Sequence, residues 1–381
     1  MVAFTIAASV AALIWAYLLL GRGRFWLIGN IIAPPAAPGP ARRVAVIIPA
    51  RNEAGVIGQT LASLLAQANE SLHVFLVDDA STDGTAQIAR QTATSLGKID
   101  SLIILESPPL PPGWSGKLWA VNQGVEAARR VAPEFLLFSD ADILHSPATI
   151  PSLVAIAEHG YDLVSFMVKL HCRSLAEKLL IPPFVFFFFM LYPPAWTRDS
   201  RHATAGAAGG CLLIRPEALA RAGGIETIRG EIIDDCALAL AVKRSGGRVW
   251  LGMTEESVSI RPYGSFSEIG RMISRTAFNQ LQHSTLLLLG AIAGLTVTYL
   301  LPPALLFSRH SVPIALGALA WAMMTASYLP MVRFYRLNPL WAPTLPLAAL
   351  FYMGATVHSA FKFWSGRGGQ WKGRAQDRAR E

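Results

Sequence analysis

Phe135-Leu136-Leu137-Phe138-Ser139-Asp140-Ala141-Asp142 is the stretch that decides the fold. Its four apolar residues in a row predict a buried strand of a parallel sheet. The strand stops at two carboxylates, Asp140 and Asp142, and α/β sheets place their ligands at such strand ends. Two adjacent carboxylates repel each other, which makes the pair a candidate site for Mg²⁺ or Mn²⁺ with water and substrate phosphate completing the shell. A solvated turn with a helix cap is the alternative, because Asp-x-Asp often occurs by chance.

The composition indicates a globular domain joined to membrane helices. Of the 381 residues, 52% are apolar and only 15% are charged, which is too apolar for an ordinary soluble enzyme. The net charge of +8 is concentrated beside apolar segments, in Arg22, Arg24, Arg42, Arg43 and a tail at 372–380. This placement suits anionic lipid headgroups, so we expect a membrane and no nucleic acid as partner. The three cysteines form no Cys-x-x-Cys pair and imply no zinc site.

Four apolar segments have the length needed to span a bilayer. The first is 1–21, and a proline-rich linker at 22–42 follows it. The other three lie within 285–361, at 285–307, 312–331 and 340–361. Because arginines follow the first segment, we expect an uncleaved anchor and a domain on the cytoplasmic side. Three later crossings would put the basic tail 362–381 outside, so 285–307, broken by two prolines, is a candidate re-entrant segment.

Residues 43–260 alternate strand and helix patterns with short connections. Such alternation predicts an α/β domain, a mostly parallel sheet with helices on both faces. The expected strands are 44–49, 73–77, 102–105, 135–138, 163–168 and 248–253, and the expected helices are 54–68, 84–96, 117–130, 147–159 and 236–244. The run 205–214 is glycine-rich and then strand-like.

Two further segments lie near the predicted membrane helices. The connector 261–284 is amphipathic and basic, with Arg271 and Arg275. The aromatic run 181–190 is too short to span a bilayer, and both an interfacial position and a buried plug are open for it.

Other polar residues follow the ends of the expected strands. Lys117 supplies a point charge for a diphosphate, next to Gly116, which lets the backbone come close. Asp79 is placed to accept from the imide N–H of uracil, and helix capping is its alternative role. Arg51 and Glu53 follow the first strand, where a base and ribose would lie, or they form a surface ion pair.

Asp234 and Asp235 open a helix, where its dipole favours a carboxylate. One of them suffices as a cap, so Asp235 is a candidate general base facing a ligand. Together, these residues describe transfer of a group from a nucleotide diphosphate. The ion would stabilise the leaving diphosphate while Asp235 deprotonates an acceptor hydroxyl for in-line attack, which inverts the anomeric carbon.

This arrangement resembles the inverting family 2 glycosyltransferases, which have the GT-A fold. The resemblance covers about 44–275 and rests on the motifs at 47–53, 77–85, 116–122 and 139–142, with Asp234-Asp235 where the family has Glu-Asp. It implies Asp142 as principal metal ligand with Asp140 nearby, and Asp235 as catalytic base. It also implies a nucleotide-sugar donor, with a UDP-sugar favoured. The residues expected to bind this donor are Pro49, Arg51, Glu53, Asp79, Lys117, Asp140 and Arg275.

Within that family the chain resembles the hopene-associated branch, bacterial proteins linked with hopanoid biosynthesis. The likeness lies in 111–120, 275–278 and 371–374 and in one leading and three trailing apolar segments. It implies a bacterial inner-membrane, multi-pass enzyme with a lipid or isoprenoid acceptor. Membrane members of the family often carry Gln-x-x-Arg-Trp. Here Arg275 matches the arginine, but Met272 and Thr276 replace the glutamine and the tryptophan, which argues against a processive polymerase.

Three alternatives stay open. A polysaccharide-type synthase of the same family is one, although the apolar segments are few for a channel. A nucleotidyltransferase acting on a membrane lipid precursor normally has a glycine-rich, basic signature after its first strand, where this chain has Ala50-Arg51-Asn52-Glu53. A non-catalytic scaffold would have no need of the acidic residues Asp140, Asp142 and Asp235.

Overall fold

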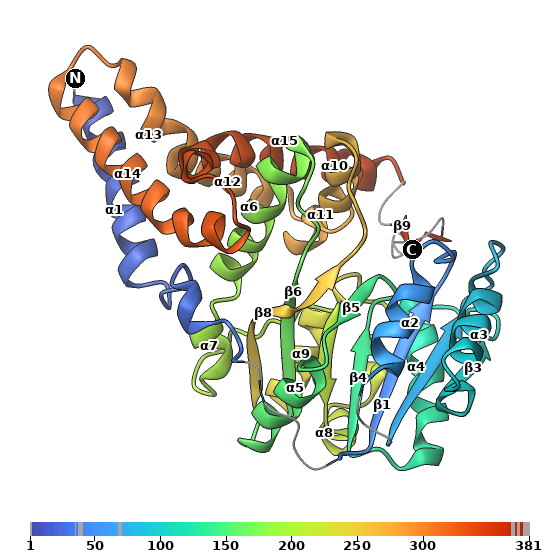
Figure 1. Cartoon of the computed structure of the whole chain (residues 1–381). Helices are drawn as coiled ribbons and strands as arrows, with labels where there is room; N and C mark the ends of the chain where they lie inside the picture. Colours follow the sequence, from blue (N-terminus) through green and yellow to red (C-terminus); the bar gives the residue numbers. More distant parts are fainter. Residues whose placement is uncertain are drawn as a thin grey trace.

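The computed structural model describes residues 2–34, 36, 41–67 and 71–366, and the backbone of 370–371 and 374–375. An apolar helix, α1 (Val2–Leu20), precedes a sheet flanked by helices (Figure 1). The strands are β1 (Val44–Ala50), β2 (Leu72–Asp78), β3 (Leu102–Glu106), β4 (Phe135–Ser139), β5 (Ile143–His145), β6 (Leu163–Lys169), β7 (Cys211–Ile214) and β8 (Val249–Ser259). The helices between them are α2 (Ile57–Leu65), α3 (Thr85–Ser95), α4 (Gly116–Ala128), α5 (Thr149–Glu158), α6 (Leu175–Leu191), α7 (Pro194–Arg198), α8 (Pro216–Arg221) and α9 (Asp234–Arg244).

The chain after β8 is mainly helical. Its helices are α10 (Phe266–Ser274), α11 (Ala277–Gln280), α12 (Thr285–Leu295), α13 (Leu301–Ala304), α14 (Ser311–Phe334) and α15 (Leu345–Trp364). Two short strands, β9 (Gln370–Trp371) and β10 (Arg374–Ala375), form an antiparallel pair. Residues 362–366 of the predicted basic tail are described as well, whereas 367–369, 372–373 and 376–381 lie outside the described part of the chain.

The eight strands from β1 to β8 form one mixed sheet in the order β3-β2-β1-β4-β7-β6-β8-β5. The half that contains β1 is parallel: β1 pairs with β2 and β4, and β2 pairs with β3. Every residue of β1 is buried, because helices cover both faces of the sheet and an apolar run is then stable throughout the strand. The predicted α/β fold is therefore confirmed, and β7, which runs antiparallel to β4 and β6, makes the sheet mixed.

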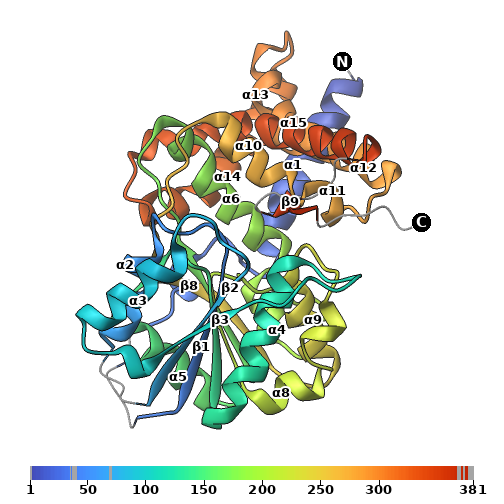
Figure 2. The same cartoon turned by 90° about the vertical axis from the view of Figure 1, so that its right-hand side faces the viewer.

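Two hydrophobic cores lie on opposite faces of this sheet. Side chains of α2, α3 and α5 fill one of them, with Leu61 and Leu153 fully buried. Side chains of α4, α8 and α9 fill the other, with Ala218 and Val242 fully buried. Figure 2 shows these two helix layers on either side of the strands. The layers leave the carboxyl ends of β1 and β4 free to carry polar loops.

Two strand boundaries differ from the sequence prediction. The three residues of β5 were not expected as a strand, and β8 continues past Met253 to Ser259. The reason is the same for both, because β5 pairs antiparallel with the extension of β8, Ile143 opposite Ser259. This pairing, together with the Ile260 N–H that donates to the Asp142 carbonyl at 2.9 Å, fixes the turn that holds Asp140 and Asp142.

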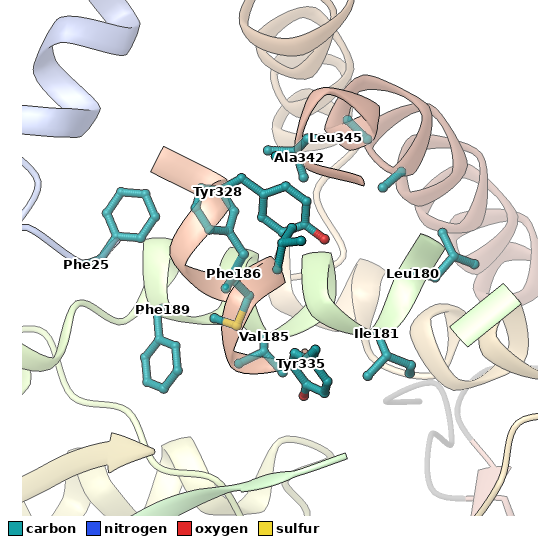
Figure 3. Close-up of a cluster of buried hydrophobic side chains, with 14 of the residues drawn as sticks. Phe25, Leu180, Ile181, Val185, Phe186, Phe189, Tyr328, Tyr335, Ala342 and Leu345 are labelled. Atoms are coloured by element: carbon teal, nitrogen blue, oxygen red, sulfur yellow. The ribbon is translucent and has the colours of Figure 1, made fainter. Parts of the chain in front are cut away.

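The aromatic run 181–190 forms the larger part of α6 and is a buried plug rather than a surface element. Figure 3 shows Phe186 and Phe189 inside a cluster that also contains Tyr328 of α14 and Leu345 of α15. Phe186 and Phe189 are at most 1% exposed. Helix α6 therefore joins the sheet domain to the apolar helices, and the interfacial interpretation is replaced by the plug.

Within the described residues, four helical segments are long and apolar enough to cross a membrane: Val2–Leu20, Thr285–Phe307, Ser311–Phe334 and Pro339–Trp364. Helices α1 and α14 lie side by side (Figure 1). The second segment is irregular, because a π-helical turn (Thr296–Leu300) precedes Pro302 and Pro303, which have no N–H to donate. Its suggested re-entrant path stays a prediction.

Three of the arginines that were expected near lipid headgroups also bind protein groups. Arg22 Nε donates to the Met190 carbonyl at the end of α6 at 3.0 Å. Arg42 pairs with Glu158, and Arg43 Nε donates to the Ala132 carbonyl. Arg42 and Arg43 precede β1, at the sheet edge opposite the acidic turn. Arg42 and Arg43 thus connect the start of β1 to Glu158 of α5 and to the loop before β4.

Candidate active site

A cavity of about 550 Å³ lies between the acidic turn after β4 and helix α10. Its walls come from two parts of the chain that are far apart in the sequence, the sheet domain and the helix that follows β8. The sheet side contributes carboxylates, and α10 with its C-cap residue contributes Glu268, Arg271, Met272 and Arg275. The full lining is Pro49, Glu53, Ser115, Lys117, Asp140, Ala141, Asp142, Glu231, Ile232, Asp234, Arg261, Pro262, Tyr263, Glu268, Arg271, Met272 and Arg275.

Lys117 joins two of the acidic elements of this cavity. It lies in the first turn of α4, whose N-cap Ser115 accepts from the Leu118 N–H. Its Nζ lies 3.3 Å from Asp140 Oδ1 and 3.1 Å from Asp234 Oδ2. Burial lowers the pKa of Lys117, but the surrounding carboxylates more than offset this and raise it above its ordinary value. The ammonium is therefore a fixed positive charge at the site.

Asp142 is paired with a residue that the sequence analysis did not single out. Arg261 Nε donates to Asp142 Oδ2 at 2.6 Å, and Arg261 Nη2 donates to Glu53 Oε2 at 2.6 Å. Burial and the charge of Asp140 raise the pKa of Asp142, while Arg261 opposes that rise. Arg261 follows the extended end of β8, so its position depends on the unexpected β5–β8 pairing.

The side-chain oxygens at this turn are suitable ligands for a divalent metal ion. Asp140 and Asp142 are hard oxygen ligands that line one cavity, and Mg²⁺ or Mn²⁺ is commonly held by one or two carboxylates plus phosphate and water. Among the residues that the structure describes, no group of three or more His, Cys, Asp or Glu is arranged to hold an ion. An ion at this turn would thus take its remaining ligands from substrate phosphate and water.

Asp235 lies beside this cavity, in a smaller hollow that also contains Lys117 and Asp140. Its Oδ2 accepts from the Gly209 N–H at 2.8 Å, and its Oδ1 accepts from the Cys236 N–H at 2.7 Å. Burial and the charge of Asp234 raise the pKa of Asp235 to about 6. The Lys117 ammonium and the two amide donors act in the opposite direction. A carboxylate with such a pKa is suited to general base catalysis near neutral pH.

Glycine at 209 leaves room for the side chains of Asp235 and Lys117. A Cβ there would lie 3.3 Å from Asp235 Oδ2 and 3.4 Å from Lys117 Nζ. The glycine-rich run 205–210 therefore serves a close approach of backbone to the acidic site, as well as leading into β7.

Arg51 and Asp79 form a separate pair at the ends of β1 and β2. Arg51 Nη1 donates to the Asp79 carbonyl at 2.5 Å and lies 3.6 Å from Asp79 Oδ2. Asp79 is 1% exposed. Neither residue lines the cavity of about 550 Å³, so their predicted contact with a base stays a prediction. Asp83, two residues before the start of α3, accepts from the Thr85 and Ala54 N–H groups.

The structure brings together most of the site residues named from the sequence. Pro49, Glu53, Lys117, Asp140, Asp142 and Arg275 all line the cavity, and Asp235 adjoins it through the hollow that it shares with Lys117. The roles of Asp234 and Arg261 were missed. Asp234 was taken for a helix cap, whereas its side chain lines the cavity and contacts Lys117.

Comparison with known proteins identifies the sheet domain. Residues 45–222 match the family described as Glycosyl transferase family 2. Among the relatives are the undecaprenyl-phosphate 4-deoxy-4-formamido-L-arabinose transferases of Pseudomonas savastanoi pv. phaseolicola, 32% identical over 130 residues, and of Serratia proteamaculans, 30% identical over 128 residues. Each match covers 33% of this chain and 36% of the relative, so the similarity spans little more than a third of those proteins.

A solved structure extends the comparison to the whole chain. The mannosyltransferase PcManGT from Pyrobaculum calidifontis, in complex with GDP-Man and Mn²⁺, covers 95% of this chain, and 99% of its own chain is covered, with 22% sequence identity and a TM-score of 0.56. At this identity the likeness establishes the fold. The sheet domain therefore has the GT-A fold, its residues 45–222 match Glycosyl transferase family 2, and it is joined to helices of membrane-spanning length.

Proposed function

We propose that this protein is a membrane-bound inverting glycosyltransferase that moves a sugar from a nucleotide-diphosphate donor to a lipid acceptor. The observation that carries the proposal is the shared cavity: one wall holds the carboxylates of the family 2 domain, and the other is α10, which packs against α15 and α6. A polar donor and a membrane-borne acceptor can meet in such a place. The bacterial inner membrane, with the domain on the cytoplasmic side, is the proposed location.

The donor would bind at the acidic turn. Asp140 and Asp142 would hold Mg²⁺ or Mn²⁺, which when bound supplies the charge that stabilises a leaving diphosphate. Lys117 and Arg275 are the cavity cations placed to bind phosphate oxygens. The base and ribose would extend toward Arg51 and Asp79, and a UDP-sugar is the proposed donor.

Asp235 is the proposed base. Its carboxylate is oriented by two amide donors and has a pKa near neutrality. It would remove the proton of the acceptor as that oxygen attacks the anomeric carbon from the face opposite the diphosphate. Such an attack inverts the configuration at that carbon.

The acceptor is proposed to be an isoprenoid lipid. The relatives named above act on undecaprenyl phosphate, as their names state, and Arg271 on α10 is a cavity cation left for an anionic lipid head. A hopanoid hydroxyl is the acceptor that the sequence resemblance suggests. Both compounds are isoprenoid, and both would enter from the membrane side.

The test is a transfer assay in membranes that contain the full chain. The membranes are incubated with Mn²⁺ and a panel of labelled nucleotide sugars, and the extracted lipids are separated. We expect label in a lipid from the wild-type protein, loss of that label on adding EDTA, and no label with Asp235→Asn. Equal labelling by wild type and Asp235→Asn would contradict the assignment of the base.

A further inference from the structure

Arg261 holds two carboxylates at once at the edge of the cavity. Its Nε and Nη2 donate to Asp142 and Glu53, each at 2.6 Å. These are charge-assisted hydrogen bonds to a planar guanidinium, which stays protonated at any physiological pH. Arg261 therefore neutralises part of the negative charge of the acidic turn.

The backbone around Arg261 is fixed, while its side chain has room to move. The Ile260 N–H donates to the Asp142 carbonyl, and Tyr263 N–H donates to Glu177 Oε1 at 2.8 Å. These bonds keep the Cα of Arg261 within reach of Asp142. The Arg261 side chain is 34% exposed, against 13% for Asp142, and it lines the open cavity. A rotation of this side chain is the movement that the surroundings allow.

Asp142 Oδ2 cannot serve two cations equally well. The oxygen that accepts from Arg261 is one of the two oxygens a divalent ion would use, and an ion there would lie beside a guanidinium that repels it. The fork of Arg261 fits phosphate as well as carboxylate. The diphosphate of the proposed donor would thus offer the arginine a second partner in the same cavity.

We propose that Arg261 is the resident counter-ion of Asp142, that it competes with the divalent ion for this carboxylate, and that it moves to the donor diphosphate when the ion binds. The last step rests on the proposed function, whereas the competition does not. Glu53 would keep Arg261 close to the turn during the exchange. It follows that the protein binds the ion weakly alone and more tightly with a nucleoside diphosphate.

The competition is tested by titrating the full chain in detergent with Mn²⁺ alone and measuring free ion by electron paramagnetic resonance. We expect R261Q to bind Mn²⁺ at this turn about tenfold more tightly than wild type, because a repelling charge is removed. R261K keeps a positive charge but loses the simultaneous hydrogen bonds to Asp142 and Glu53, so its Mn²⁺ affinity should lie between those of wild type and R261Q. The double variant R261Q/D142N should lose the gain.

The matched control is R221Q, which removes another arginine–carboxylate pair, Arg221 with Asp162 at 2.8 Å, outside the cavity. It should bind Mn²⁺ as wild type does. Unchanged or weaker Mn²⁺ affinity in R261Q and R261K would overturn the proposal, because Arg261 would then orient Asp142 for the ion. No nucleotide or sugar is needed, so the result is readable even if the transfer reaction proves to be another one. A second titration with UDP present tests the proposed move of Arg261 to the diphosphate. If Arg261 makes this move, UDP should increase the Mn²⁺ affinity less in R261Q than in wild type.

Discussion

The Nζ of Lys117 lies 3.1 Å from Oδ2 of Asp234, which joins the first turn of α4 to the first turn of α9. Because Asp235 is the next residue, this ion pair fixes the end of the helix that carries the proposed base. The same ammonium reaches Asp140. One lysine thus connects the acidic turn after β4 with the proposed base.

Replacing Lys117 by methionine should change the pH dependence of transfer as well as its rate. The ammonium favours the charged form of Asp235, so without it the pKa of that carboxyl should rise further above its ordinary value. We expect the acidic limb of the kcat/KM profile to move to higher pH. Lys169→Met is the matched control, since Lys169 pairs with Glu255 at 3.2 Å outside the cavity. A lower rate with an unmoved profile would mean that Lys117 acts on the donor alone.

The proposed base predicts both a rate loss and a pH dependence. Asp235→Asn should lower kcat by about 10²–10⁴, the range of general base catalysis, while leaving nucleotide-sugar binding nearly unchanged. In the wild type only the deprotonated carboxylate can accept the proton. Since burial raises its pKa to about 6, kcat/KM should fall as the pH drops through about 6 and level off above it. A profile that is flat between pH 5 and 8 would contradict this assignment.

Arg271 of α10 and Arg275, the C-cap residue of that helix, should affect different substrates. Arg271→Gln should raise the KM for the lipid acceptor by about tenfold, the loss of about one charge-assisted hydrogen bond, with the donor KM unchanged. Arg275→Gln should raise the donor KM instead. Steady-state kinetics with each substrate varied in turn would separate the effects. If both variants change the same KM, the division of the cavity between donor and acceptor is wrong.

Glu177 should be important for stability rather than for chemistry. This buried residue at the start of α6 accepts from His171 Nδ1 and from the N–H groups of Arg173, Ser174 and Tyr263. Glu177→Gln should destabilise the protein by about 1–3 kcal/mol, the cost of leaving buried partners poorly paired. Thermal unfolding in detergent measures this, with Glu217→Gln, an exposed first-turn glutamate of α8, as control.

The same carboxylate predicts a response to acid. Although burial raises the pKa of Glu177, its hydrogen-bond donors dominate and lower it to about 2. A group whose pKa is depressed in the folded state stabilises that state above its ordinary pKa of 4.5. That contribution should be lost as the pH falls from 4.5 toward 2. Glu177→Gln should therefore show a smaller loss of stability than wild type over this range.

Local sequence patterns predicted the sheet and most of the acidic site. Apolar runs that end in polar residues placed Asp140, Asp142 and Lys117 at one edge of the sheet, because parallel strands bring their carboxyl ends together. The strand β5 was missed, since its three residues carry no pattern of their own and depend on pairing with β8. Tertiary pairing is a property of two segments, and a single segment does not reveal it.

Arg261 could not be found for a related reason. Its partners lie 119 and 208 residues away in the chain, and an arginine at the start of a basic connector indicates nothing by itself. Asp234 was misjudged because a carboxylate in the first turn of a helix already has a sufficient explanation. Its contact with Lys117 of α4 depends on how two helices pack on one face of the sheet.

The phenylalanine-rich helix α6 has a practical consequence for biochemistry. A shortened protein ending near residue 260 would retain α6 but lose α14 and α15, whose Tyr328 and Leu345 help to enclose its rings. The uncovered aromatic surface would favour aggregation in water. Purification trials should therefore keep the carboxyl-terminal helices and rely on detergent or nanodiscs, because these helices cover the aromatic rings of α6.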